Sequence, residues 1–345
     1  MKESITPTPV AIFGANLILR HLDGLVIEIP GVKAAEDIEF IHRMRVASRR
    51  LRNAIPIFNQ VLPTRKTETW GKEIRKITRA LGAARDVDVQ LESLKKFLTT
   101  VRSASHLVPG VRRLILRFEQ QRTSLQMDVI NALDHFETSR IADNIHTTLD
   151  PLAAQYDGTL PAHADLYSLS HRTIHDRLNE FFLREEAIRE VQNISELHAQ
   201  RIAAKHLRYT MELFAPLYSN ELRPYLNTCR KFQDQLGAIH DCDVWIVLLP
   251  EFQFQEKQRT VEYYGKSDPY NLLIPGILEF KSSRSSMRNT LFFEFINDWD
   301  AAISKGLWQQ LRSQVSTPLL SPTTFHRPEE SISPSPPTPE TPPPA

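Results

Sequence analysis

Cysteine and glycine are scarce in this 345-residue chain, which has two cysteines and 11 glycines. Two cysteines exclude a disulfide framework, and Cys229 and Cys242 lack the Cys-x-x-Cys spacing of a zinc site. We interpret both as buried thiols of a protein from a reducing compartment. The sequence also lacks a secretory signal pattern and a continuous apolar run of the roughly 20 residues that span a membrane. We therefore expect a cytoplasmic protein that makes no membrane contact.

Common signatures of catalysis and metal binding are absent as well. The sequence has no P-loop, no Gly-x-Gly-x-x-Gly segment and no His-Glu-x-x-His pair. Neither His42 nor His198 has the neighbours of a nucleophilic or general-base arrangement. We therefore expect a protein that is not an enzyme and that has no cofactor and no bound metal.

Positive and negative charges nearly balance over the whole chain, but they are unevenly distributed along it. The formal net charge is +1, whereas residues 41–122 contain 19 Lys+Arg and 6 Asp+Glu. A neutral total thus conceals a strongly basic block. Such blocks attract partners that carry many phosphates.

The body of the chain reads as consecutive helices, because apolar residues recur at three- and four-residue spacing with no sustained alternation. We interpret Asp143–Pro161 as the junction between two halves and 253–284 as a second irregular region. Ten of the 23 prolines lie between Pro318 and Pro344, so the segment 315–345 is predicted to be a disordered, Pro/Ser/Thr-rich tail. The predicted helices cover about 10–24, 34–62, 66–98, 109–136, 165–190, 194–218, 221–252 and 285–313.

Two motifs occur twice, in the same order. Residues 41–58 (IHRMRVASRRLRNAIPIF) align with 197–214 (LHAQRIAAKHLRYTMELF), and 75–89 (RKITRALGAARDVDV) align with 230–244 (RKFQDQLGAIHDCDV). The offsets are 156 and 155 residues, which is too long for a solenoid repeat. The sequence therefore predicts an all-α tandem duplication over residues 8–314, with repeat 1 at about 8–142 and repeat 2 at about 162–314.

The first motif carries a one-sided row of cations. At 100° per residue, four side chains of 41–58 fall within an arc of about 80°, opposite an apolar stripe that suits a helical core. The second repeat reproduces the row position for position. Like charges on one helix face repel by about a few tenths of a kcal/mol per pair, so a repeated row needs either carboxylates on neighbouring helices or an external polyanion. The rows are His42, Arg45, Arg49 and Arg52, and His198, Arg201, Lys205 and Arg208.

The second motif adds cations and two pairs of aspartates. Asp86/Asp88 and Asp241/Asp243 resemble metal-binding pairs, but residues two apart on a helix point about 200° apart and cannot share one ion. We expect one carboxylate of each pair to orient the arginines; a Mg²⁺ or Ca²⁺ that accompanies a phosphate ligand is the alternative. Gly82 and Gly237 are assigned to helix packing. The additional cations are Lys72, Arg75, Lys76, Arg79, Arg230 and Lys231.

These motifs resemble the CHAD (conserved histidine α-helical domain) family. The resemblance rests on His42-x-x-Arg45-x-x-x-Arg49-Arg50-x-Arg52, on Leu81-Gly82-x-x-Arg85-Asp86-x-Asp88-Val89, and on their repetition, over roughly residues 8–314. It implies two four-helix bundles related by pseudo-twofold symmetry, whose basic helices line a central groove that binds inorganic polyphosphate. It also implies that Arg50 belongs to the binding site.

The second repeat departs from the family pattern. His206 stands where a further basic residue is usual, Gln200 replaces an apolar residue, and His240 replaces the equivalent of Arg85. These changes weaken the positive potential of the second half. The Glu-x-Glu-x-Lys signature of the triphosphate-tunnel enzymes that often accompany CHAD domains is absent.

The sequence thus favours non-catalytic binding of polyphosphate, with targeting to polyphosphate granules as one use. A generic polyanion or nucleic-acid binder is the main alternative, although the basic rows lack interleaved aromatics for base stacking. A phosphate-transferring enzyme that uses His42 or His198 is a second alternative, and a structural protein whose rows pair internally is a third. The sequence leaves the oligomeric state undetermined.

Overall fold

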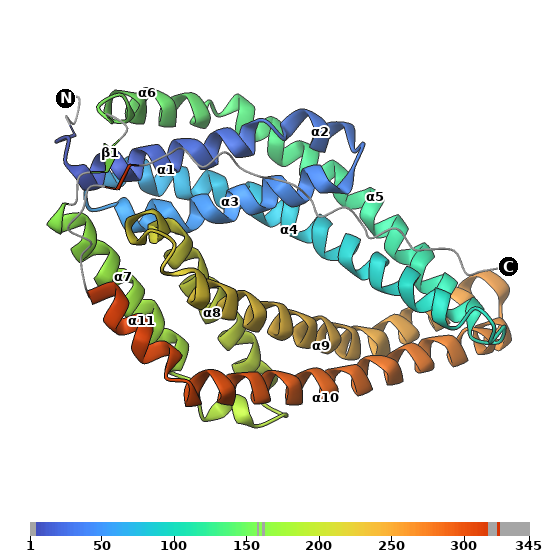
Figure 1. Ribbon diagram of the computed structural model, residues 1–345. Coiled ribbons are helices and arrows are strands. Elements are labelled where there is room, and N and C mark those ends of the chain that lie inside the picture. Colours follow the sequence, from blue (N-terminus) through green and yellow to red (C-terminus); the bar gives the residue numbers. More distant parts are fainter. Residues whose placement is uncertain (1–4, 157–158, 161–162, 317–322, 325–345) are drawn as a thin grey trace, which may run out of the picture.

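The computed structural model describes residues 5–156, 159–160, 163–316 and 323–324, and the all-α prediction is confirmed (Figure 1). The first half contains α1 (Pro9–Val26), α2 (Ile29–Ala34), α3 (Ile38–Phe58), α4 (Thr64–Thr100), α5 (Val108–Thr138) and α6 (Ile141–Ala153). The second contains α7 (Ala164–Phe182), α8 (Ile194–Phe214), α9 (Arg223–Tyr264), α10 (Ile274–Ser304) and α11 (Leu307–Ser316). Single 3₁₀ turns cover Ala187–Arg189, Ala215–Tyr218 and Asp268–Leu272.

The described strands are two residues long and lie outside the helical body. β1 (Thr159–Leu160) pairs antiparallel with β2 (Thr323–Thr324). Most of the segment 315–345, which the sequence predicts to be disordered, lies outside the described residues.

Local sequence explains where the main helices begin and end. The Thr8 hydroxyl accepts a hydrogen bond from the Ala11 N–H and caps α1, and the Asp37 carboxylate accepts one from the Glu39 N–H and caps α3. The helices α1, α5, α9 and α10 each have proline in the first turn, where its missing N–H is not needed. Gly265, at a φ of 70°, ends α9.

The two segments that were expected to be irregular are largely helical, and this corrects the prediction. Most of Asp143–Pro161 forms α6, whose Pro151 lies near the helix end. In 253–284, α9 continues to Tyr264 and α10 begins at Ile274. Proline does not interrupt either helix, because Pro275 lies in the first turn of α10 and Pro151 lies near the end of α6.

The halves repeat the same order of helices. In this order α1, α3, α4, α5 and α6 correspond to α7, α8, α9, α10 and α11, so a shorter fifth helix accompanies the four long ones of each half. Within each half, α3 packs on α1 and α4, and α8 packs on α7 and α9. The longest helices lead away from this packed region to the far end of the molecule, where α5 and α10 meet (Figure 1).

A third repeated motif lies where α5 and α10 meet. Residues 107–111 (LVPGV) and 273–277 (LIPGI) begin these two helices. A Cβ atom on Gly110 would overlap the Leu273 carbonyl oxygen, and one on Gly276 would overlap the Leu107 carbonyl oxygen. The reciprocal contact means that glycine at both positions permits the helix starts to cross at backbone distance.

The hydrophobic core is divided into two clusters, both of which join the halves. In the main cluster Phe13 stacks on Phe214 at 6.2 Å between ring centroids and meets the edge of Phe58 at 6.1 Å. In the far cluster, formed by α4, α5, α9 and α10 with Tyr270 and Leu273, Phe97 lies 5.0 Å from Phe280. The two halves are therefore fixed to each other at both ends.

The segment Pro9–Ala34 is long and apolar enough to cross a membrane by length and composition alone, with a mean hydropathy of 1.6. Within this segment, 56% of the most apolar 18-residue stretch is buried inside the fold. The helix α1 packs against α3 and α6. A helix at the centre of a helical body meets the same criterion.

Candidate ligand-binding site

The basic faces of α3 and α8 are turned toward each other across the contact between the halves. We name the facing side chains the cation cluster. Lys205 on α8 interacts with arginines of α3, and Arg49 on α3 interacts with arginines of α8. Arg49 and Lys205 occupy equivalent positions in the two repeats. The cation cluster consists of Arg45, Arg49 and Arg52 of α3 and Arg201, Lys205 and Arg208 of α8.

Burial and the charges of neighbouring cations lower the pKa values of Lys205, Arg49 and Arg52. Burial, followed by the charges of Arg49 and Arg201, lowers the pKa of Lys205 to about 8. Burial, followed by Arg45 and Arg208, lowers the pKa of Arg49 to about 9. The pKa of Arg52 is lowered by burial and by Arg75 of α4. The cluster therefore stores electrostatic repulsion that an anion would relieve.

Few carboxylates balance this charge. Asp86 of α4 lies 3.3 Å from the Arg45 guanidinium and is 68% exposed. Glu212 of α8 lies 3.3 Å from Arg208 and 4.0 Å from Arg50. Asp241 of α9 is close enough to Arg201 and Arg45 to be influenced by both. Within the described residues, six cations thus meet three carboxylates, and one of those is shared with Arg50.

The cluster also contains buried polar atoms that have no hydrogen-bond partner in the described part of the chain. Among them are Nε of Arg49, Nε of Arg201 and Nε of Arg208, together with the hydroxyl of the neighbouring Tyr209 and Oε2 of the neighbouring Glu212. The guanidinium carbons of Arg49 and Arg208 lie 5.1 and 4.9 Å from the centroid of the Tyr209 ring. Buried donors without partners are uncommon in native proteins, so their concentration here is typical of a ligand site.

The histidines flank the cluster in different ways in the two halves. Burial, followed by the charge of Arg85, lowers the pKa of His42. In the second half His240 takes the place of Arg85, and its Nδ1 lies 3.2 Å from Nδ1 of His198. Burial and Arg201 lower the pKa of His240 to about 4, and the pKa of His198 is lowered by burial and Arg201 as well. At neutral pH the pair is uncharged, and one ring can donate to the other.

Gly82 and Gly237, the repeated glycines of the second motif, lie next to arginine side chains of the cation cluster and not against the backbone of another helix. A Cβ atom on Gly82 would lie 4.0 Å from Nε of Arg45, and one on Gly237 would lie 3.6 Å from Nε of Arg201. A Cβ atom at either of these equivalent positions on α4 and α9 would therefore make only an ordinary van der Waals contact with the arginine. The glycines that do serve close helix packing are Gly110 and Gly276.

Some predicted site residues lie apart from the facing rows. Lys76 pairs with Glu73 at 2.9 Å and approaches His135 of α5 at 3.1 Å. Lys231 pairs with Asp298 of α10 at 2.6 Å. Arg75 is close enough to Arg52 to influence it. The predicted site residues that are exposed on α4 and α9 also include Lys72, Arg79 and Arg230.

The two aspartates of each pair have separate roles, as the helical geometry predicts. Asp86 contacts the cation cluster through Arg45. Asp88 is buried and accepts a hydrogen bond from Arg122 of α5 at 2.7 Å, and the equivalent Asp243 is paired with Arg288 of α10. No group of three His, Cys, Asp or Glu side chains suited to a metal ion occurs among the described residues.

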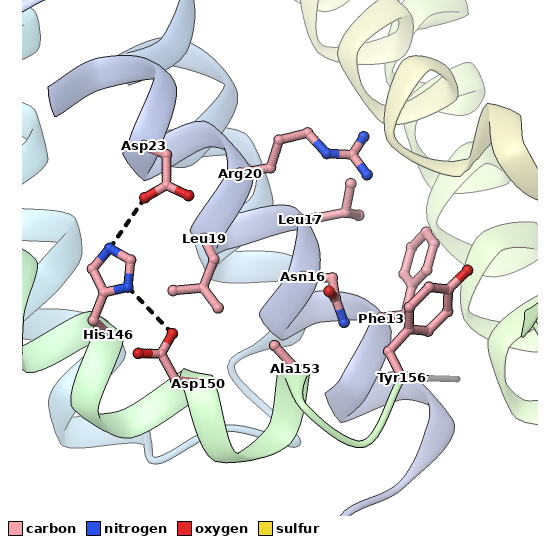
Figure 2. A pocket seen from close by; sticks show the side chains of 10 residues that line it. All are labelled: Phe13, Asn16, Leu17, Leu19, Arg20, Asp23, His146, Asp150, Ala153 and Tyr156. Carbon is pink, nitrogen blue, oxygen red and sulfur yellow. Dashed lines mark hydrogen bonds and ion pairs between the residues drawn. The ribbon is translucent and has the colours of Figure 1, made fainter. Parts of the chain in front are cut away.

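A separate cavity of about 380 Å³ lies between α1 and α6 (Figure 2). His146 lines this cavity and is paired with Asp23 at 3.1 Å and with Asp150 at 3.2 Å (Figure 2). Phe13 and Leu17 form part of its apolar wall. None of the six cation-cluster residues lines this cavity, and its carboxylates make it a poor site for a polyanion.

Comparison with known proteins agrees with this architecture. The family model of the CHAD domain matches residues 16–250. The crystal structure of the CHAD domain from the plant Ricinus communis is 23% identical, with a TM-score of 0.58, over 82% of this chain and 91% of that chain. PptA from Streptomyces chartreusis is 17% identical, with a TM-score of 0.54, over 86% of this chain and 100% of that chain. A search of curated proteins gave no match.

The structural similarities, both below 25% identity, establish a shared fold. The family model covers more than half of the chain and includes both copies of the basic, histidine-bearing helix. The resemblance inferred from the repeated motifs is thereby confirmed. The chain belongs to the CHAD-domain family.

Proposed function

We propose that this protein binds inorganic polyphosphate at the cation cluster without altering it chemically. The observation that carries the proposal is the meeting of six cations from two halves with only three nearby carboxylates among the described residues. Membership of the CHAD-domain family, with which polyphosphate binding is associated, supports the same ligand.

The chemistry of polyphosphate suits this arrangement. Its chain is flexible, carries about one negative charge per phosphate and offers no base to read, so binding requires many cations and few geometric constraints. Arginine supplies forked contacts to phosphoryl oxygens, and Lys205 supplies a compact charge. His42 and His198 would donate hydrogen bonds at the ends of the rows. Recruitment of the protein to polyphosphate granules in the cytoplasm is the use that we propose for such binding.

Replacing Arg45, Arg49, Arg201 and Arg208 together by Ala is expected to abolish binding of long-chain polyphosphate. The variant should keep its helical circular dichroism, because removal of crowded like charges relieves repulsion. Affinity would be measured by titration at several salt concentrations. The affinity of the wild type should fall steeply as the salt concentration rises. The matched control replaces Lys96, Arg112, Lys257 and Lys305 by Ala; these four exposed cations lie on other faces, and the control should retain most of the affinity.

Two alternatives predict different results. A generic polyanion or nucleic-acid binder would bind a single-stranded DNA of matched charge as tightly as polyphosphate, whereas we expect polyphosphate to displace the DNA. A phosphate-transferring enzyme would release orthophosphate from polyphosphate during incubation with Mg²⁺. Unchanged affinity in the fourfold arginine variant would show that the cation cluster is not the binding site.

A further inference from the structure

Tyr209 of α8 lies inside the cation cluster, although it belongs to neither row of cations. Its ring is contacted by Arg49 from the first half and Arg208 from the second, at 5.1 and 4.9 Å from the ring centroid. A guanidinium over an aromatic ring is stabilised by the ring quadrupole, so Tyr209 helps to hold two mutually repelling cations together. Its position therefore connects the two halves of the site.

The hydroxyl of Tyr209 is the unexplained part of this side chain. The residue is only 5% exposed, and its hydroxyl has no hydrogen-bond partner in the described part of the chain. A phenylalanine would give the same ring contacts without burying a polar group. Burial of an unpaired hydroxyl costs about 1–3 kcal/mol, so packing alone disfavours tyrosine here.

Two other buried tyrosines, Tyr218 and Tyr167, have partners for their hydroxyls. The Tyr218 hydroxyl lies 2.9 Å from the Ser170 hydroxyl, and the Tyr167 hydroxyl donates to the Leu217 carbonyl at 3.0 Å. Tyr209 differs from both in lying among cations. The equivalent position in the first repeat is Asn53, so this tyrosine is a feature of the second half alone.

We propose that Tyr209 is a ligand-contacting residue of the cation cluster, whose hydroxyl donates a hydrogen bond to a phosphoryl oxygen held by Arg49 and Arg208. The inference rests on the proposed function, since it names an additional contact in the same site. The guanidiniums of Arg49 and Arg208 lie over the Tyr209 ring at the ends of flexible side chains. If they move onto a phosphoryl group, that group is brought to the side chain of Tyr209. The bound phosphate then supplies the missing partner.

The experiment compares Tyr209→Phe with Tyr218→Phe in the full-length protein. Tyr209→Phe is expected to weaken binding of long-chain polyphosphate roughly tenfold or more, the effect of one hydrogen bond to a charged group, while the free energy of unfolding stays equal or rises. The salt dependence of affinity should keep its slope, because no charge is removed. Tyr218→Phe, the control, should lower the free energy of unfolding and leave affinity unchanged.

Each other outcome is decisive. Wild-type affinity in Tyr209→Phe would overturn the hydroxyl contact. A joint loss of affinity and stability, or a shallower salt slope, would mean that Tyr209 acts only by supporting the arginines, and would also overturn it. Absence of polyphosphate binding by the wild type would instead overturn the proposed function.

Discussion

Lys205 is the one lysine of the cation cluster, whose other members are arginines. Burial, followed by the charges of the surrounding arginines, lowers the pKa of Lys205 to about 8, so this side chain is partly neutral just above physiological pH. An arginine at the same position would remain charged. The single lysine in a cluster of arginines thus gives the site a stronger dependence on pH near 8 than an all-arginine site would have.

The affinity of the wild type for polyphosphate is expected to fall as pH rises from 7 to 8.5, because Lys205 loses its proton. Lys205→Arg should remove most of this fall, and titrations of both proteins at the two pH values would show it. The stability of the ligand-free protein changes with pH in the direction opposite to the affinity. Between pH 8 and the ordinary lysine pKa of 10.5 the unfolded chain binds the additional proton, so the Lys205 contribution to stability rises with pH. A pH profile that is identical in both proteins would contradict this assignment.

His240 provides a second test, because it replaces the Arg85 equivalent in the second repeat. With a pKa lowered to about 4, it is neutral at pH 7 and adds no positive charge. His240→Arg is expected to raise polyphosphate affinity a few-fold at pH 7.5 by adding a permanent charge beside Arg201. Affinity measured across a salt series should show a steeper slope for the variant. Equal affinity would indicate that this end of the row does not reach the ligand.

The histidines also determine how the free protein responds to acid. Since the folded-state pKa values of His42, His198 and His240 lie below the ordinary value of 6.5, the unfolded chain takes up protons first as pH falls below that value. Their contribution to stability is therefore present above about pH 6.5 and is lost as pH decreases toward the folded-state values. Bound polyphosphate would oppose this loss.

At the scale of helices, α5 and α10 cross at backbone distance. Gly276→Ala would place a Cβ atom against the Leu107 carbonyl oxygen, which is backbone and cannot rotate away. We expect a loss of about 1–3 kcal/mol in the free energy of unfolding, measured by chemical denaturation. Gly71→Ala in α4 is the control, because no atom lies within 4 Å of its added Cβ. It should be neutral or stabilise by about 0.5–1 kcal/mol.

A destabilising effect of equal size in both glycine variants would contradict the crossing.

The motif at this crossing is not predicted by the sequence analysis, because segments of only five residues, LVPGV and LIPGI, carry little periodic signal. Its offset of 166 residues also differs from the 155 and 156 of the longer motifs, so it falls outside a simple alignment of the halves.

At the scale of the whole molecule, the halves share both hydrophobic clusters. Phe13 of the first half is buried against Phe214 of the second, and Phe97 against Phe280. Separation would expose these surfaces to water at a cost of roughly 25 cal/mol per Å². The duplication therefore does not imply two independent folding units.

We expect the fragments 1–160 and 161–345, produced separately, to unfold with low cooperativity and to recover cooperative unfolding when mixed. Circular dichroism during urea denaturation would measure the cooperativity of unfolding of the separate and the mixed fragments. The intact chain serves as the control. Two fragments that each unfold cooperatively, with no gain on mixing, would show that the shared clusters contribute little.

The sequence by itself determined the helical class, the duplication and the composition of the two basic rows. These properties follow from periodicity along one chain, since residues three and four apart share a helix face wherever the helix is placed. The separate roles of Asp86 and Asp88 follow from the same geometry.

Only the tertiary structure decided which cations face each other. Lys76 and Lys231 belong to the same motif as Arg75 and Arg230, yet they pair with carboxylates at 2.9 and 2.6 Å. Tyr209 is identified as a site residue only by the tertiary structure, because the packing of α3 against α8 brings Arg49 to its ring. Helical periodicity fixes a direction on one helix, whereas the neighbour in that direction depends on how the helices pack, and packing is a property of the whole fold.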